Sequence, residues 1–269
     1  MRTPYVAGTF YPSDPSALRW QIGQCFADGP GMPGDCTGRR EIAAVLAPHA
    51  GYACSGACAA YSFKAIAEDG LPEAYVIVGP DHYGVPYGAV MCGEDYATPL
   101  GPCRIHSGIA DRLREYIPDD PRAHVREHSI EVEVPFIQYI DPDAEIVPVI
   151  MGRQDMRSAE HLAHCIKTAC EGYDAVIIAS SDLVHYVPKP YADAADARFL
   201  GAVASGDVPA VYGIVERENL SVCGYGPTAV AMMLSGGRKE ILCQTDSFES
   251  LGYGGGSVVG YGSAAMYRV

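Results

Sequence analysis

The chain has few basic side chains and no long apolar run. Lys and Arg total 19 of its 269 residues against 33 Asp and Glu, which gives a formal net charge of −14 at pH 7. Phosphate backbones and anionic lipids repel a chain of this charge, so we expect neither a nucleic-acid partner nor a membrane surface. No apolar stretch approaches the roughly 18 residues that a membrane-spanning helix needs.

The signals of an exported, disulfide-bonded protein are also missing. The first residues contain no apolar segment of a secretory signal, and the ten cysteines include no Cys-x-x-Cys pair. We therefore expect a cytoplasmic protein whose cysteines are reduced thiols, most of them small core residues.

No internal repeat and no long polar linker interrupts the chain, which excludes a solenoid and predicts a single domain over residues 1–269. Apolar residues make up 48% of the sequence, as in ordinary globular proteins. Short runs rich in β-branched residues predict strands covered on both faces. These strands are expected at 42–47, 74–78, 144–150 and 175–179, and a last strand at 257–267.

Amphipathic segments alternate with these apolar runs. Asp14 and Pro15 form a cap and a first turn, which predicts a helix after them. Further helices are predicted between Gly56 and Glu68, around 162–169 and from Pro227 onward. Strands that alternate with helices predict an α/β fold with helix layers on both faces of the sheet.

Polar residues follow three of the predicted strands. Pro-His-Ala-Gly-Tyr at 48–52 follows the first, Gly-Pro-Asp-His-Tyr-Gly at 79–84 the second, and Ser-Ser-Asp-Leu-Val-His at 180–185 the fourth. If these strands are parallel, all three segments emerge at the carboxyl edge of the sheet, where open α/β folds bind ligands. The residues that would converge there are His49, His82, His185, Asp81 and Asp182. Imidazoles and carboxylates brought together are the usual ingredients of a metal site.

Each of these residues also has a structural interpretation. A single loop histidine is usually hydrogen-bonded at the surface, and Asp81 and Asp182 are common turn residues or helix caps. The serines at 180 and 181 are most simply turn hydroxyls. The joint occurrence at three strand ends leaves the metal site and the structural interpretation both open.

The segment Glu-His-Ser-Ile-Glu-Val-Glu at 127–133 adds titratable groups. In one interpretation Ser129 caps a helix whose first turn carries glutamates. In the other, which we favour, Glu127 or His128 orients an imidazole that itself binds the metal.

Among the cysteines, Cys223 precedes a Gly-Tyr-Gly-Pro turn and a predicted helix. A thiol near a helix N-terminus can have a lowered pKa, and the thiolate is the form that acts as ligand or nucleophile. Cys54 and Cys58, four residues apart on one predicted helix, are interpreted as packing residues. Cys92 and Cys243 lie in strand-like apolar runs and are interpreted as core.

Several of these segments together resemble the Memo family over nearly the whole chain. The most specific are Ala-Pro-His-Ala-Gly-Tyr at 47–52 and Glu-His-Ser-Ile-Glu at 127–131. The segments at 7–12, 79–82, 180–185 and 222–224 agree with them. The resemblance implies the fold of the class III extradiol ring-cleaving dioxygenases, a three-layer α/β/α sandwich around a mixed, mostly parallel sheet.

The resemblance also implies the roles of the site residues. His49, His82 and Cys223 would surround one metal ion, and His185 would match the acid/base histidine of the related dioxygenases, with Asp182 in the same cleft. Those dioxygenases hold Fe(II) with two histidines and one glutamate, so Cys223 is a departure. A thiolate favours copper(I), zinc or a thiolate-ligated iron.

Three functions are compatible with these residues. The first is a mononuclear iron- or copper-dependent oxidoreductase. The second is a non-catalytic module that binds a peptide or small molecule in the same cleft, with Tyr11, Tyr52 and Tyr83 stacking on a flat ligand. The third is a zinc-dependent hydrolase, which the lack of His-Glu-x-x-His and Gly-x-Ser-x-Gly motifs disfavours.

Partners are implied by the resemblance alone. Archaeal and bacterial members of the family often accompany a radical-SAM protein and a small accessory protein. The animal member has been described as a redox-active metal protein and as a binder of phosphotyrosine peptides. It carries Trp-Tyr where this chain has Phe10 and Tyr11.

Overall fold

Four runs of alanine and β-branched residues form the centre of the sheet, as the sequence predicts. The computed structural model describes residues 1–36, 38–254 and 256–269. The strands β1 (Ile42–Ala47), β2 (Ala74–Pro80), β6 (Glu145–Met151) and β7 (Ala175–Ser180) are almost wholly buried. Burial on both faces explains why their apolar residues do not alternate with polar ones.

These four strands pair in parallel in the order β6-β2-β7-β1, and β5 (Gly101–Ile105) extends the parallel part beyond β6. Antiparallel strands complete the ten-stranded sheet of the described residues. They are β3 (Ala89–Met91), β4 (Tyr96–Thr98), β8 (His185–Val187), β9 (Lys239–Asp246) and β10 (Val258–Tyr267). The predicted last strand is β10, which pairs with β1. The sheet is therefore mixed, with a parallel centre.

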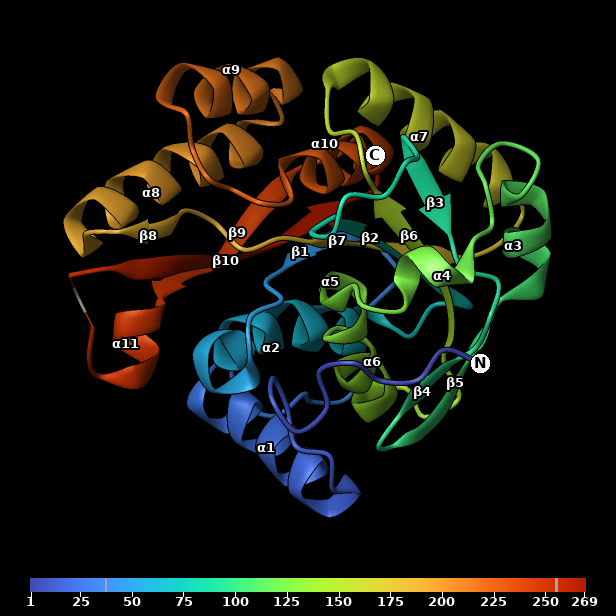
Figure 1. Ribbon diagram of the computed structural model, residues 1–269, viewed down its shortest axis with the longest axis horizontal. Helices are drawn as coiled ribbons and strands as arrows, with labels where there is room; N and C mark the ends of the chain where they lie inside the picture. Colours follow the sequence, from blue (N-terminus) through green and yellow to red (C-terminus); the bar gives the residue numbers. More distant parts are fainter. Residues whose placement is uncertain (37, 255) are drawn as a thin grey trace.

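Helices cover both faces of this sheet (Figure 1). One face carries α1 (Pro15–Asp28), α2 (Tyr52–Asp69), α6 (Val134–Ile140) and α11 (Ser247–Leu251). The other carries α3 (Ser107–Leu113), α7 (Met156–Ala169), α8 (Lys189–Ser205), α9 (Val208–Glu218) and α10 (Tyr225–Ser235). Two short helices, α4 (Pro121–His124) and α5 (His128–Glu131), lie in the connection before α6. A separate hydrophobic core fills each side of the sheet, which confirms the three-layer α/β/α architecture.

The local sequence pattern predicted the first residue of one helix correctly and that of another incorrectly. The Asp14 carboxylate accepts a hydrogen bond from the Ala17 amide at 2.8 Å, and Pro15 occupies the first turn, as predicted. In contrast, α2 begins at Tyr52 rather than Gly56, because Tyr52 is buried and its turn packs into the core. None of the helices in the described residues is long and apolar enough to cross a membrane.

A buried ion pair joins the first residues of the chain to α5. Arg2 is 3% exposed, and its guanidinium lies 2.6 Å from the Glu131 carboxylate. Glu131 also accepts hydrogen bonds from the backbone amides of Tyr5 and Val6 and from the Tyr11 hydroxyl. A buried charge is tolerated only when it is paired and hydrogen-bonded, so this network holds the N-terminal segment against α5.

We expect Glu131→Gln to lower the free energy of unfolding by about 3–5 kcal/mol, because it leaves the Arg2 charge buried without a counter-charge. Urea unfolding followed by circular dichroism measures this loss. The matched control is Glu145→Gln, whose partly exposed pair with Arg104 spans 3.6 Å. Glu145→Gln should lower the free energy of unfolding by less than about 1 kcal/mol. Equal losses in the two variants would contradict the assignment.

A second buried carboxyl group lies on α8. The Asp196 side chain is 1% exposed and accepts a hydrogen bond from the Val184 amide at 3.1 Å. Its other oxygen packs against Gly260, where an added Cβ would lie 1.7 Å away. Burial, followed by the charges of Asp193 and Asp246, raises the pKa of Asp196 to about 7.

The raised pKa of Asp196 predicts a specific pH dependence of stability. The folded chain holds a proton that an unfolded aspartate, with a pKa near 3.9, releases. The contribution of Asp196 to stability therefore falls as pH rises from about 4 to about 7 and stays constant above that range. Asp196→Asn keeps the acceptor for Val184 and removes this fall. Urea unfolding across this pH range measures the free energy of unfolding of both chains. The value for Asp196→Asn should rise relative to that of the wild type as pH rises. A difference that does not change with pH would refute the raised pKa of Asp196.

Candidate metal centre

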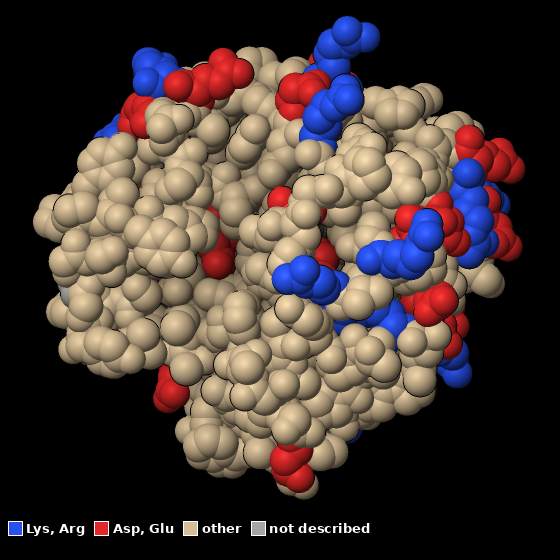
Figure 2. Space-filling view, viewed as in Figure 1, with Lys and Arg blue, Asp and Glu red and all other residues tan. Residues whose placement is uncertain are grey.

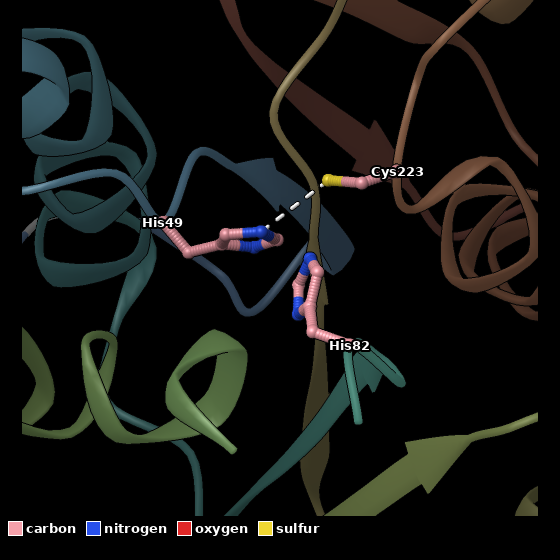
Figure 3. Close-up of side chains that lie close together, drawn as sticks. All are labelled: His49, His82 and Cys223. Atoms are coloured by element: carbon pink, nitrogen blue, oxygen red, sulfur yellow. Dashed lines mark hydrogen bonds between the residues drawn. The ribbon is translucent and has the colours of Figure 1, made fainter. Parts of the chain in front are cut away.

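Two imidazoles and one thiol meet at the carboxyl edge of the parallel strands (Figure 3). His49 lies two residues beyond β1, His82 two residues beyond β2, and Cys223 in the connection between α9 and α10. One ligand atom from each lies within 4.8 Å of the others. The Cys223 Sγ is 3.3 Å from the His49 Nε2, although 174 positions separate the two residues. The predicted convergence of these three side chains is present in the structure.

Figure 2 shows the surface of the molecule from the same side as Figure 1. Most charged side chains lie at its margins. Near the centre the surface is hollowed, with acidic side chains inside the hollow and basic ones beside it.

The His49 ring is oriented by a hydrogen bond at Nδ1, the ring nitrogen that does not face Cys223. Its Nδ1 lies 2.7 Å from the Ser180 Oγ, which also lies 2.6 Å from the Ser129 carbonyl and 2.9 Å from the Glu133 carboxyl. Ser180 has one hydroxyl proton. Burial raises the pKa of the nearby Glu133 carboxyl well above its ordinary value. Whether the Ser129 carbonyl or the Glu133 carboxyl accepts the Ser180 proton, that proton is not available to His49. The His49 Nδ1 is then a donor, and its Nε2 is free to bind a metal.

His82 is oriented by a charged carboxylate instead. Glu127 accepts hydrogen bonds from the His82 Nδ1 and from its backbone amide, each at 2.8 Å. Burial would raise the pKa of Glu127, but the bonds from His82 and Ser129 outweigh it and lower the pKa to about 2. This is the carboxylate–histidine arrangement that commonly fixes a metal-binding imidazole. The Nε2 of His82 is again left free.

The interpretation of Ser129 as a helix cap is wrong, because Glu127 has that role. Glu127, and not Ser129, is the N-cap of α5, and it accepts the Ser129 amide proton. The Ser129 hydroxyl donates to the Pro80 carbonyl at 3.0 Å, which leaves it unable to act as the cap. His128 does not hydrogen-bond either ligand imidazole. It stacks on His82 with ring centroids 4.5 Å apart, and burial lowers its pKa to about 4.

Asp182 and His185 lie beside the three ligand side chains. The Asp182 carboxylate accepts a hydrogen bond from the His49 amide at 2.8 Å and so holds the loop after β1. Burial raises the pKa of Asp182 to about 6, against the lowering effect of His185. His185 is the first residue of β8, and its Nδ1 contacts the Ser221 carbonyl at 2.8 Å. Its ring is partly exposed, with Nε2 left unbonded by that contact.

Three residues expected at the site have structural roles instead. The Asp81 carboxylate accepts hydrogen bonds from the backbone amides of residues 83–85 and forms a turn. Tyr11 and Tyr52 are each 3% exposed, and their hydroxyls bond to Glu131 and to the Val132 carbonyl. Both rings are packed in the core, so the expectation that they stack on a ligand is wrong.

The expected low pKa of Cys223 is also wrong. Burial, followed by the negative charge of Asp182, raises the pKa of the Cys223 thiol. These effects outweigh the nearby start of α10. A metal cation reverses this balance, because it stabilises the thiolate directly.

Sequence reasoning missed two residues that support the centre. Glu133 belongs to the segment 127–133, in which only Glu127 and His128 were expected to orient a ligand imidazole. Gln154 follows β6, and its side chain bonds the Cys223 carbonyl at 2.7 Å and the Gly226 amide at 2.8 Å. It thereby holds the loop that carries the thiol. Its position after a parallel strand is the one signal that could have suggested it.

Comparison with known proteins decides the family. A family model described as Memo-like protein matches residues 2–265. The chain belongs to the Memo family. A MEMO1 family protein of Methanothermobacter thermautotrophicus is 40% identical over 243 residues, covering 87% of this chain and 88% of its own. One of Methanopyrus kandleri is 39% identical over 280 residues, covering 99% of both chains.

A solved structure is similar to this Memo-family chain in fold. It is the crystal structure of an uncharacterized protein from Escherichia coli K12, with a TM-score of 0.56 and 14% sequence identity. The alignment covers 84% of this chain and 99% of the other. This likeness supports the layered α/β architecture.

The donor set of this Memo-family chain fits one metal ion. Both Nδ1 atoms are occupied by hydrogen bonds, so two Nε2 atoms and one Sγ are available. An ion at about 2.0–2.1 Å from nitrogen and about 2.3 Å from sulfur can lie between ligand atoms this close. Imidazole with thiolate suits zinc, copper or iron better than magnesium or calcium.

We expect Glu127→Gln to weaken metal binding about 10–100-fold, because His82 loses the carboxylate that orients it and raises its basicity. A competition titration of zinc against a chromophoric chelator measures the affinity. Glu73→Gln is the matched control, since Glu73 precedes β2 at the opposite, amino end of that strand. Zinc affinity within about twofold of the wild type in Glu127→Gln would show that the hydrogen bond is unimportant.

Proposed function

We propose that this Memo-family protein is a mononuclear metal-dependent oxidoreductase whose iron or copper ion is held by His49, His82 and Cys223. The observation that carries this proposal is the convergence of two free Nε2 atoms and one Sγ within 4.8 Å. When bound, such a metal supplies one-electron redox chemistry.

The number and type of the ligands support a catalytic site. Structural zinc sites are closed by four protein ligands, whereas catalytic metal sites use three and keep a position open. His49, His82 and Cys223 are three. Thiolate and imidazole together are ligands that suit redox-active copper and iron.

The neighbouring side chains supply proton transfer and orientation. The His185 imidazole is partly exposed and is held through Nδ1 by Ser221, so its Nε2 is available to a bound substrate. Imidazole is the side chain best suited to moving protons near neutral pH. Asp182 orients the backbone of His49 through its amide. His49 and His82 are positioned by Ser180 and Glu127.

A second function, a non-catalytic binding module, is favoured by one surface observation. Tyr83, next to His82, is 44% exposed, and Tyr5 is 47% exposed. The Arg126 guanidinium lies 4.8 Å from the centre of the Tyr83 ring. Exposed aromatic rings and a guanidinium can hold a flat or anionic ligand of the peptide or small-molecule class. Zinc-dependent hydrolysis is a third hypothesis that the same metal assays address.

The test is the metal content of protein purified without oxygen and reconstituted separately with Fe(II) and Cu(I). We expect stoichiometric metal in the wild type and loss of most of it in His49→Ala, His82→Ala and Cys223→Ser. His161→Ala on α7 is the control and should keep its metal. Oxygen uptake and the metal's spectrum on exposure to air then report redox activity.

The outcomes separate the three functions. Metal content unchanged by the three ligand substitutions would refute the centre itself. Bound iron or copper without oxygen uptake or a redox change would contradict the oxidoreductase and favour the binding module. Tight binding of zinc alone, with ester hydrolysis lost in the ligand variants, would favour the hydrolase.

A further inference from the structure

Four of the ten cysteines line one cleft outside the group of metal ligands. The cleft has a volume of about 540 Å³ and lies among α1, α2, β9 and α11. Its walls include Cys25, Cys54, Cys58 and Cys243. Trp20, at its edge, is 68% exposed, so the cleft is open to solvent. The sequence suggested only packing roles for these thiols.

The fold places two of these thiols on neighbouring elements in the wall of the same cleft. Cys58 faces β9 from α2, which packs against that strand, and Cys243 lies on β9 opposite Ser263 of β10. Both side chains line the cleft, and each thiol shifts the pKa of the other. Cys58 is 1% exposed, whereas Cys243 is only partly buried. A molecule from solvent can therefore reach the Cys243 thiol, whereas the Cys58 thiol is buried.

The two thiols also differ in their acidity. Burial raises the pKa of Cys25 to about 12 and raises the pKa values of Cys54 and Cys58. The neighbouring Cys58 side chain lowers the pKa of Cys243, against the effect of burial. Reactive cysteines are those with thiolate character and access to solvent, and a neighbouring thiol commonly resolves their oxidised form.

We propose that Cys58 and Cys243 form a redox-active dithiol that reduces a hydroperoxide entering this cleft. Cys243 is the nucleophile because it is the accessible thiol of the pair, and Cys58 is the resolving thiol because it is buried on the helix that packs against β9 in the same cleft. The pair is independent of the metal centre, since neither residue is a ligand there.

The reaction balances in two steps. The Cys243 thiolate attacks the terminal oxygen of the hydroperoxide, the S–O bond forms, the O–O bond breaks, and the alcohol or water leaves after taking a proton. Cys243 is then a sulfenic acid. The Cys58 sulfur attacks the Cys243 sulfur, the S–S bond forms, the S–O bond breaks, and the hydroxide takes the Cys58 proton to leave as water. Two electrons pass from the thiols to the peroxide, and a small dithiol reductant restores the pair.

The experiment treats the reduced protein with one equivalent of hydrogen peroxide, blocks the remaining thiols and maps the peptides. All chains carry Cys223→Ser, so oxidation at the metal centre does not contribute. We expect a loss of two thiols per chain and a cross-linked peptide that contains Cys58 and Cys243. In Cys58→Ser, a cyclic 1,3-diketone should trap the sulfenic acid on Cys243.

Cys243→Ser should slow the loss of thiols on the order of tenfold, because the remaining cleft thiols are more buried or less acidic. Cys54→Ser is the matched control, because it lies in the same cleft and one turn from Cys58. It should react like the parent chain. Thermal melting checks that each variant is folded.

A measurement that needs no cleft variant is competitive alkylation of the otherwise intact chain with isotope-labelled iodoacetamide. Cys243 should be modified before Cys25, Cys54 and Cys58. A disulfide between other cysteines, a Cys243→Ser chain that reacts as fast as its parent, or Cys243 alkylated last would each overturn the proposal. None of these outcomes depends on whether the metal centre is an oxidoreductase.

Discussion

The parallel pairing of β1, β7 and β2 is the constraint on which the metal centre depends. Neighbouring parallel strands end at the same edge of the sheet, so the segments that follow them meet even when they are far apart in the chain. His49, His82 and Asp182 reach the site in this way. The pairing is itself stabilised by burial of the strands on both faces, between two hydrophobic cores. A slip of one residue in register would turn the buried side chains of a strand to the other face and move its terminal loop.

The two ligand imidazoles have different hydrogen-bond partners, and their pKa values are shifted in opposite directions. Glu127 receives hydrogen bonds from His82 and from the Ser129 amide, so it stays ionised and raises the pKa of His82 against the effect of burial. Glu133 has the Ser180 hydroxyl as its hydrogen-bond partner, and burial raises its pKa well above the ordinary value. Burial, followed by the neighbouring histidines, lowers the pKa of His49. His82 therefore lies against a carboxylate, whereas His49 lies against a serine hydroxyl.

Helix α2 connects the metal centre to the thiol cleft. It begins three residues after His49 and carries Cys54 and Cys58 on its next turns. The sequence predicted its existence but not its start, because the burial of Tyr52 is not visible in a local pattern. Among the strands at the margins, β4, β5 and β8 were not predicted, and β3 and β9 were recognised only as strand-like runs around Cys92 and Cys243. They are short, exposed or antiparallel, so they lack the continuous apolar run that marks a strand covered on both faces.

By itself the sequence determined the central strands, the alternation with helices on both faces, and the position of His49 and His82 after two of the strands. These follow from periodicity and from the position of polar residues after strands, which are local properties of the chain. The full ligand set with Cys223 was implied only by the resemblance to the Memo family. Only the tertiary structure decided that Glu127 rather than His128 bonds His82, that Tyr11 and Tyr52 are core residues, that the Cys223 thiol is made less acidic, and that the thiols at 58 and 243 line one cleft. The physical reason is that hydrogen-bond partners, burial and charge proximity arise between segments distant in sequence, and no local pattern records them.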